Sequence, residues 1–161
     1  MDLGDIFRGN ALNAVDAKGR LSVPAFVRSV AERRFEGRAI VVGAHDVSPC
    51  LAAYGLASAQ DIYDEMERRR LAEEARGGSL EDHYARARRI FGMAEDVPYD
   101  PSGRIILPAM LRRKGRIEDL ALFVGVGGIV EIWNPHVALK EGNAELKEIA
   151  AFRLEEKGIT P

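Results

Sequence analysis

The chain contains the segment Asp16-Ala17-Lys18-Gly19-Arg20-Leu21-Ser22-Val23-Pro24-Ala25-Phe26-Val27-Arg28, and a second copy, Asp100-Pro101-Ser102-Gly103-Arg104-Ile105-Ile106-Leu107-Pro108-Ala109-Met110-Leu111-Arg112, begins 84 residues later. The Asp, the Gly, the first Arg, the Pro, the Ala and the last Arg are identical, and the apolar positions match in type. An internal repeat determines the architecture, because each copy forms the same small structural unit. The sequence therefore predicts two related halves, each with an arginine directly after a tight turn.

The repeat extends on both sides of this segment. Three further pairs match: Phe7 with Phe91, residues 39–43 with 121–125, and residues 51–54 with 130–133. The offset between the copies falls from 84 to 79 residues along the repeat, as loop deletions between elements would produce. We therefore place repeat 1 at about 7–54 and repeat 2 at about 91–133.

The first four residues of each copy predict a turn. In the second copy they read Asp-Pro-Ser-Gly: the Asp accepts a backbone hydrogen bond, the Pro presets φ, and the Gly takes the left-handed conformation. The first copy has the same frame without the proline. This pattern is typical of a hairpin loop with a glycine bulge. We expect hairpins at about 10–23 and 96–107, with Arg20 and Arg104 as the first residues of the returning strands.

Pro24 and Pro108 end these strands and suit the first turn of a helix, where a missing N–H costs nothing. The predicted elements are helices at about 24–35 and 108–114, strands at about 39–44, 50–54, 121–126 and 129–133, a helical insert at about 56–93 with a capping box at Ser79, and one last helix after Asn134. Neither half alone buries enough apolar surface, so we expect the halves to share a core. The sequence therefore predicts one domain, 1–161, of the α+β class.

The composition limits the class of protein. The chain has 161 residues with the make-up of an ordinary soluble globular protein, and no apolar run approaches the roughly 20 residues of a membrane helix. Its acidic start, residues 1–5, is unlike a signal peptide. A single cysteine, Cys50, excludes an internal disulfide and suits a reducing compartment. We expect a cytoplasmic protein without a membrane span.

The charge distribution is uneven, although the formal net charge is only −2. Residues 8–38 carry seven basic and three acidic side chains, and residues 100–116 carry five basic and one acidic. Each repeat motif is thus a basic island of net charge +4, and the remainder of the chain carries −10. A local basic face attracts a polyanion even on a slightly acidic molecule. The alternative is that these arginines are dispersed over solvated helix faces.

The sequence lacks the residue patterns of common enzymes. Its three histidines are scattered, and none has metal-ligand spacing to another histidine or to Cys50. No phosphate-binding loop, dinucleotide fingerprint or nucleophile elbow is present. Asp16 and Asp100 could be catalytic, but their place at the start of a glycine-containing turn has a structural explanation. We expect neither an enzyme nor a cofactor, a metal or a small-molecule substrate.

The arginines that follow the turns have no such structural explanation. One interpretation is a plain Asp–Arg pair within each hairpin, which contributes little when it is exposed. The other is functional, because an aspartate beside an arginine restricts the direction of the guanidinium. A guanidinium held in this way suits bidentate contact with phosphate or with the O6 and N7 atoms of guanine.

Three groups of residues resemble a known family: Phe7-Arg8-Gly9, the segment from Asp16 to Pro24, and the second motif Asp100-x-x-Gly103-Arg104-x-x-x-Pro108. Together they resemble the MraZ family of bacterial transcriptional regulators over nearly the whole chain. The resemblance implies a pseudo-two-fold β-barrel related to the swapped-hairpin AbrB-like fold, with helices between and after the repeats. It also implies a ring-shaped homo-oligomer that binds direct repeats in double-stranded DNA at the promoter of the division and cell-wall gene cluster.

In the family these motifs form a basic face associated with DNA, and the resemblance assigns that face to Asp16, Lys18, Gly19 and Arg20 and to Asp100, Gly103 and Arg104. The residues expected to bind DNA are Arg20, Arg104, Lys18, Arg8, Arg28 and Arg112. The residues expected to form the turns are Asp16, Gly19, Asp100 and Gly103. Ser102 stands where the first copy has Lys18, so the two motifs need not contribute equally. We expect a nucleoid-associated regulator, and the alternatives are an oligomeric interaction or assembly protein with a basic docking face, or a hydrolase.

Overall fold

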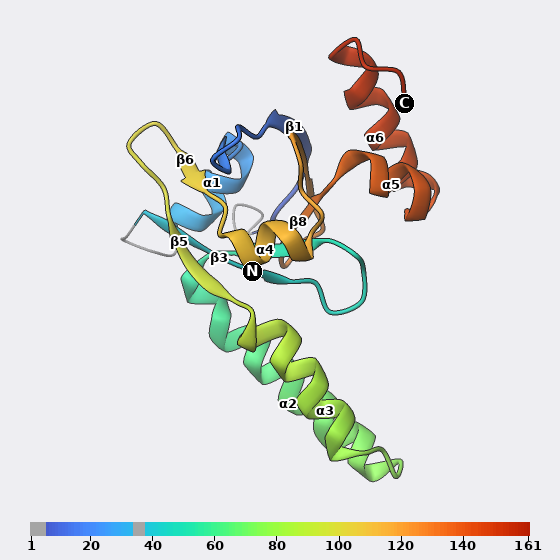
Figure 1. Ribbon diagram of the computed structural model, residues 1–161. Helices are drawn as coiled ribbons and strands as arrows, with labels where there is room; N and C mark the ends of the chain where they lie inside the picture. The colour runs from blue at the N-terminus through green and yellow to red at the C-terminus, as the bar shows by residue number, and fades with distance from the viewer. Residues whose placement is uncertain (1–5, 34–37) are drawn as a thin grey trace.

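The computed structural model describes residues 6–33 and 38–161, which form a mixed arrangement of helices and antiparallel strands (Figure 1). The larger sheet has six strands in the order β1-β7-β8-β4-β3-β5. These strands are β1 (Asn10–Ala14), β7 (Leu120–Gly125), β8 (Val130–Trp133), β4 (Leu51–Tyr54), β3 (Ala39–Ala44) and β5 (Glu95–Pro98). A separate two-stranded ribbon pairs β2 (Arg20–Ser22) with β6 (Arg104–Ile106).

The two halves exchange their first strands. Strand β1 of the first repeat pairs with β7 of the second, and β5 of the second repeat pairs with β3 of the first. Replacing each strand by its counterpart in the other repeat therefore gives the same strand order read from the opposite edge of the sheet. The central pairs Ala52–Glu131 and Leu21–Ile105 join repeat counterparts. A pseudo-two-fold axis consequently passes between β4 and β8 and between β2 and β6.

The predicted hairpins at 10–23 and 96–107 are confirmed at their turns, but the predicted pairing of the strands within each hairpin is wrong. The Asp16 N–H donates to the Arg20 carbonyl, and the Gly19 N–H donates to the Asp16 carbonyl, both at 3.0 Å. Beyond the turn, however, β1 pairs with β7 while β2 pairs with β6. Turn chemistry reverses the chain but does not select the partners of the strands. The larger sheet is open, with β1 and β5 at its edges.

Helices follow the ribbon strands as expected. They are α1 (Ala25–Arg33) and α4 (Ala109–Lys114), which begin directly after the two prolines. Residues 34–35 of the first predicted helix lie outside the described residues. The four predicted strands after these helices are confirmed, with ends that differ by one residue at most.

The insert between the repeats forms an arm that extends away from the sheets (Figure 1). It contains the short helix η2 (Leu56–Ser58), α2 (Ala59–Ala75), α3 (Leu80–Ala87) and the π-helix η3 (Arg88–Gly92). The predicted cap is confirmed, because the Ser79 hydroxyl accepts the Asp82 N–H at 3.2 Å. The last predicted helix is two helices, α5 (Pro135–Glu141) and α6 (Ala144–Glu156), because Asn143 caps a new helix after Gly142.

The main apolar cluster draws residues from both repeats. Its fully buried members include Leu51 from the first repeat and Phe123 and Ile132 from the second. Leu21 and Ile105 of the ribbon belong to the same cluster and are only 3% and 1% exposed. Because side chains alternate along a strand, burial of these two residues turns their neighbours in the ribbon outward.

Candidate nucleic-acid interface

The outer face of the ribbon carries two arginines. Arg20 lies opposite Ile106, and Ser22 lies opposite Arg104, on either side of the buried Leu21–Ile105 pair. All four outer residues are exposed. Arg20 and Arg104 are diagonal neighbours, and such positions lie roughly 7–8 Å apart in an antiparallel pair. The structure thus brings together two arginines that are 84 residues apart in the chain.

The first turn fixes the direction of Arg20. Asp16 Oδ1 accepts the main-chain N–H groups of Lys18 and Arg20, both at 2.9 Å. Asp16 Oδ2 accepts Arg20 Nε at 2.7 Å. The hydrogen bonds from the main chain and side chain of Arg20 hold the pKa of the Asp16 carboxyl below its usual value. Gly19 has a φ of +84°, which favours glycine at this position.

The second turn repeats this arrangement. Asp100 Oδ1 accepts the main-chain N–H groups of Ser102 at 2.9 Å and of Arg104 at 3.0 Å. Asp100 Oδ2 accepts Arg104 Nε at 3.1 Å. The main-chain N–H of Arg104 is the largest cause that lowers the pKa of the Asp100 carboxyl, and its side chain adds to the effect. Gly103 has a φ of +80°.

In the part of the chain that the structure describes, both arginines keep their terminal nitrogen atoms free for an external group. Within residues 6–33 and 38–161, the side chains of Arg20 and Arg104 donate hydrogen bonds only through Nε. Their side chains are 49% and 55% exposed. An arginine tethered at Nε still presents Nη1 and Nη2, and these donors match a phosphate or the guanine edge.

Arg28 and Arg112 each lie against the turn of the other repeat. Arg28 Nε donates to the Val23 carbonyl at 3.1 Å, and its guanidinium packs so closely that a β carbon on Gly103 would lie 2.7 Å from Arg28 Cζ. Arg112 donates to the carbonyls of Glu118 at 2.8 Å and Ala17 at 3.4 Å. These contacts give both arginines a structural part in holding the turns.

The two remaining basic residues of the expected set differ in position. Lys18 is exposed within the first turn, beside Arg20. Arg8 is also exposed, but it follows Phe7, whose N–H donates to the Gly127 carbonyl at 2.9 Å. Arg8 therefore lies beside the β7–β8 turn, at the opposite end of β1 from Gly19.

Comparison with known proteins identifies the family. A family model described as "MraZ protein, putative antitoxin-like" matches residues 90–138, which include the second turn and Arg104. The chain is 37% identical over 129 residues to "Transcriptional regulator MraZ" of Rhodospirillum rubrum, which covers 80% of this chain and 79% of that protein. The chain belongs to the MraZ family. A second MraZ relative, from Thermomicrobium roseum, is 36% identical over 132 residues, with 81% and 82% of the two chains covered.

The match to a MraZ protein of Rickettsia peacockii is longer: 33% identity over 144 residues, covering 89% of this chain and 91% of that protein. This coverage extends well beyond the second repeat that the family model matches. In the described part of the chain, no helix is both long and apolar enough to cross a bilayer.

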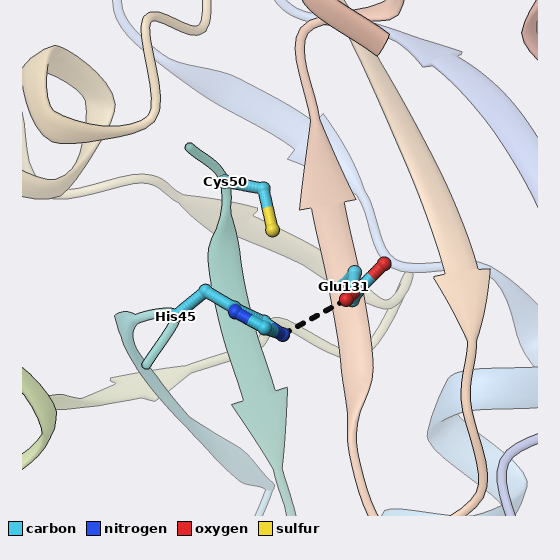
Figure 2. A group of neighbouring side chains, drawn as sticks. All are labelled: His45, Cys50 and Glu131. Atoms are coloured by element: carbon cyan, nitrogen blue, oxygen red, sulfur yellow. Dashed lines mark ion pairs between the residues drawn. The ribbon is translucent and has the colours of Figure 1, made fainter. Parts of the chain in front are cut away.

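The structure also brings His45 and Cys50, which lack metal-ligand spacing in the sequence, together with Glu131. His45, Cys50 and Glu131 place one potential ligand atom each within 4.8 Å of the others (Figure 2). His45 Nε2 lies 2.8 Å from Glu131 Oε2, and Trp133 Nε1 donates to the same carboxylate at 2.9 Å. His45 and Cys50 lie in the loop between β3 and β4, and Glu131 lies in β8, so spacing along the sequence does not indicate that Glu131 joins the other two.

The hydrogen bonds of His45 favour a structural role over metal binding. Its Nδ1 accepts the N–H groups of Val47 at 3.1 Å and Ser48 at 2.9 Å, so the ring proton resides on Nε2 and points to Glu131. A histidine that binds a metal through Nε2 normally donates its Nδ1–H instead. Burial also raises the pKa of the Cys50 thiol, which disfavours the thiolate. The cluster therefore connects the β3–β4 loop to β8.

The carboxyl of Glu131 is held in its charged form. Burial alone would raise its pKa, but the hydrogen bonds from His45 and Trp133 outweigh burial and lower it. A charged acceptor strengthens both hydrogen bonds. Glu131 also lies in the central pair of the larger sheet, opposite Ala52, so this connection stabilises the junction between the two repeats.

Proposed function

We propose that this chain is a sequence-specific DNA-binding transcriptional regulator that acts on direct repeats at the promoter of the division and cell-wall gene cluster. Membership of the MraZ family and the regulator name of its relatives support the regulatory role. The observation that carries the DNA contact is the pair of arginines on the outer face of the ribbon, each tethered at Nε by an aspartate.

The shape of this face suits the major groove of DNA. The groove admits a two-stranded antiparallel ribbon, and side chains on the outer face of such a ribbon reach base edges. Arg20 and Arg104 supply the bidentate donors, and Lys18 adds a phosphate contact next to Arg20. Arg28 and Arg112 contribute by holding the turns, and Arg8 meets the DNA backbone outside the ribbon.

Assembly supplies the affinity that one short ribbon lacks. In this proposal, residues 1–161 form one domain in which the ribbon closes the open sheet into a barrel, and several copies form a ring. Subunits in a head-to-tail ring all face in one sense, so they match direct repeats rather than a palindrome. Each ribbon then needs only modest affinity, because linked binding events reinforce one another. The protein acts in the cytoplasm, on the nucleoid.

The test compares binding to two duplexes at a stated salt concentration. One is the repeat-containing fragment from upstream of the division and cell-wall cluster, and the other is the same fragment scrambled. We expect Arg20→Ala/Arg104→Ala to lose the preference for the repeats, with Arg20→Ala the more damaging single change because Lys18 makes its turn more basic. The matched control Arg68→Ala/Arg88→Ala removes the same charge from the arm, where these side chains are 69% and 70% exposed.

Two results would overturn this proposal. One is equal binding of the unchanged protein to repeat and scrambled DNA, which would favour an assembly protein with a basic docking face. The other is a folded, assembled Arg20→Ala/Arg104→Ala variant that binds the repeats as the unchanged protein does. In that case the ribbon does not read the DNA.

A further inference from the structure

Two hollows flank the paired arginines of the ribbon. One has a volume of about 390 Å³ and the other about 250 Å³, and Arg20 and Arg104 line both. The remaining lining residues of the two hollows are repeat counterparts, position for position. The hollows are thus related by the same pseudo-two-fold axis as the strands, and each borders one side of the arginine pair.

The two hollows are lined by side chains of different chemical type. The larger hollow contains Pro98 and Ile106 where the smaller contains Ala14 and Ser22. Ile106 is 61% exposed, although its neighbour in the ribbon, Ile105, is buried. Tyr99 also lines the larger hollow, but it is 5% exposed and its hydroxyl donates to Glu32 at 2.9 Å. Pro98 and Ile106 are therefore the exposed apolar groups on this side of the arginines, and of the two Ile106 lies on the outer face of the ribbon.

A symmetric DNA-binding ribbon cannot distinguish the two directions of a DNA element. A ribbon whose two halves were identical would bind an element equally well in either direction. Direct repeats, in contrast, have a direction. A head-to-tail assembly that reads them therefore needs a residue that differs between the two halves of each ribbon, and the outer face provides one pair of this kind, Ser22 and Ile106.

The geometry points to Ile106 as a specificity-determining residue that contacts the 5-methyl group of a thymine, and to the Ser22–Ile106 difference as the feature that sets the direction of reading. This inference rests on the proposed function. In the major groove the thymine methyl is the apolar group that base edges offer, and apolar side chains pack on it. Ser22, with a hydroxyl that donates or accepts, tolerates several base edges at the equivalent position on the other side.

The test begins with the unchanged full-length protein and a pool of random-sequence duplexes, from which the bound motif is recovered. Each thymine of that motif is then replaced by uracil, which removes only the methyl group. We expect one thymine, to one side of the centre of the motif, at which uracil weakens binding about fourfold, as for loss of one buried methyl-sized group. For Ile106→Ala, uracil at the same position should cause no further loss.

A swap of the two residues provides the stronger test. In Ser22→Ile/Ile106→Ser the exposed isoleucine moves to the smaller hollow and the serine to the larger one. Both positions are exposed, so the fold is retained. We expect this variant to select a motif whose methyl-dependent thymine lies on the other side of the centre. Ser22→Ala serves as the control and should leave the position of that thymine unchanged.

The outcomes separate this inference from the function on which it rests. If the unchanged protein recovers no motif, the proposed function fails. If a motif is recovered and depends on Arg20 and Arg104, but uracil has no effect at any thymine or the swap leaves the motif in place, only the role of Ile106 is overturned.

Discussion

Gly103→Ala should destabilise the protein through two separate effects. Gly103 has a φ of +80°, and a residue with a β carbon in the left-handed region costs roughly 1–2 kcal/mol. The added carbon would also lie 2.7 Å from Nε and Cζ of Arg28, so the guanidinium must move. That movement breaks the hydrogen bond from Arg28 Nε to the Val23 carbonyl, which contributes about 1 kcal/mol. The expected loss in the free energy of unfolding is about 2–3 kcal/mol.

Two other glycines separate these effects. Gly77 has nearly the same φ, +82°, but within residues 6–33 and 38–161 a β carbon there meets nothing within 4 Å, so Gly77→Ala should cost only the backbone share of roughly 1–2 kcal/mol. Among the described residues, nothing lies within 4 Å of a β carbon placed on Gly128, which has no positive φ, so Gly128→Ala should be close to neutral. In an Arg28→Ala background the cost of Gly103→Ala should fall to that of Gly77→Ala.

Urea unfolding followed by circular dichroism measures these differences, with the slope of each transition checked to confirm a common mechanism. Equal losses for Gly103→Ala and Gly77→Ala would refute the packing of Arg28 against the second turn. An unchanged cost of Gly103→Ala in the Arg28→Ala background would refute it independently.

Three further outcomes are expected. Native mass measurement at micromolar concentration should give several times the mass of one chain, and a monomer would remove the multivalency argument. The pKa values of Asp16 and Asp100 are lower in the folded protein than in the unfolded chain, so both carboxylates stabilise the fold above the unfolded pKa of about 3.9. This stabilisation is lost as the pH falls through the folded pKa values, so the difference in Tm between the unchanged protein and Asp16→Asn/Asp100→Asn should shrink below about pH 4. A difference in Tm that stays constant with pH would contradict this. Cys50, 2% exposed with a raised thiol pKa, should resist iodoacetamide in the folded protein and react after unfolding in urea, whereas rapid reaction of the folded protein would show that its site is open.

The repeat predicts most of the local structure but not the pairing of strands. Turn residues act over four positions, so Asp16 to Gly19 could be read directly as a turn. The partner of β1 depends instead on which strand edge completes a buried face, and that edge belongs to β7, more than 100 residues away. The contact of Arg28 with the opposite turn could not be predicted for the same reason, because this contact depends on the pairing of β2 with β6.

The candidate site was partly predictable for a similar reason. An arginine after each turn glycine stands out because nothing in the turn requires it, so Arg20 and Arg104 could be selected from residue type and position alone. Ile106 could have been noticed as the apolar counterpart of Ser22, but its exposure depends on burial of Ile105. The contact of His45 with Glu131 joins the loop after β3 to β8 and has no motif at all.

Chemical modification of arginine side chains tests most directly whether Arg20 and Arg104 touch DNA. The full-length protein is treated with phenylglyoxal, free and bound to repeat DNA, and each modified arginine is quantified by peptide mass spectrometry. We predict that DNA protects Arg20 and Arg104, while Arg68, exposed on the arm, reacts equally in both states. Full reactivity of Arg20 and Arg104 in the complex, with protection elsewhere, would contradict the account.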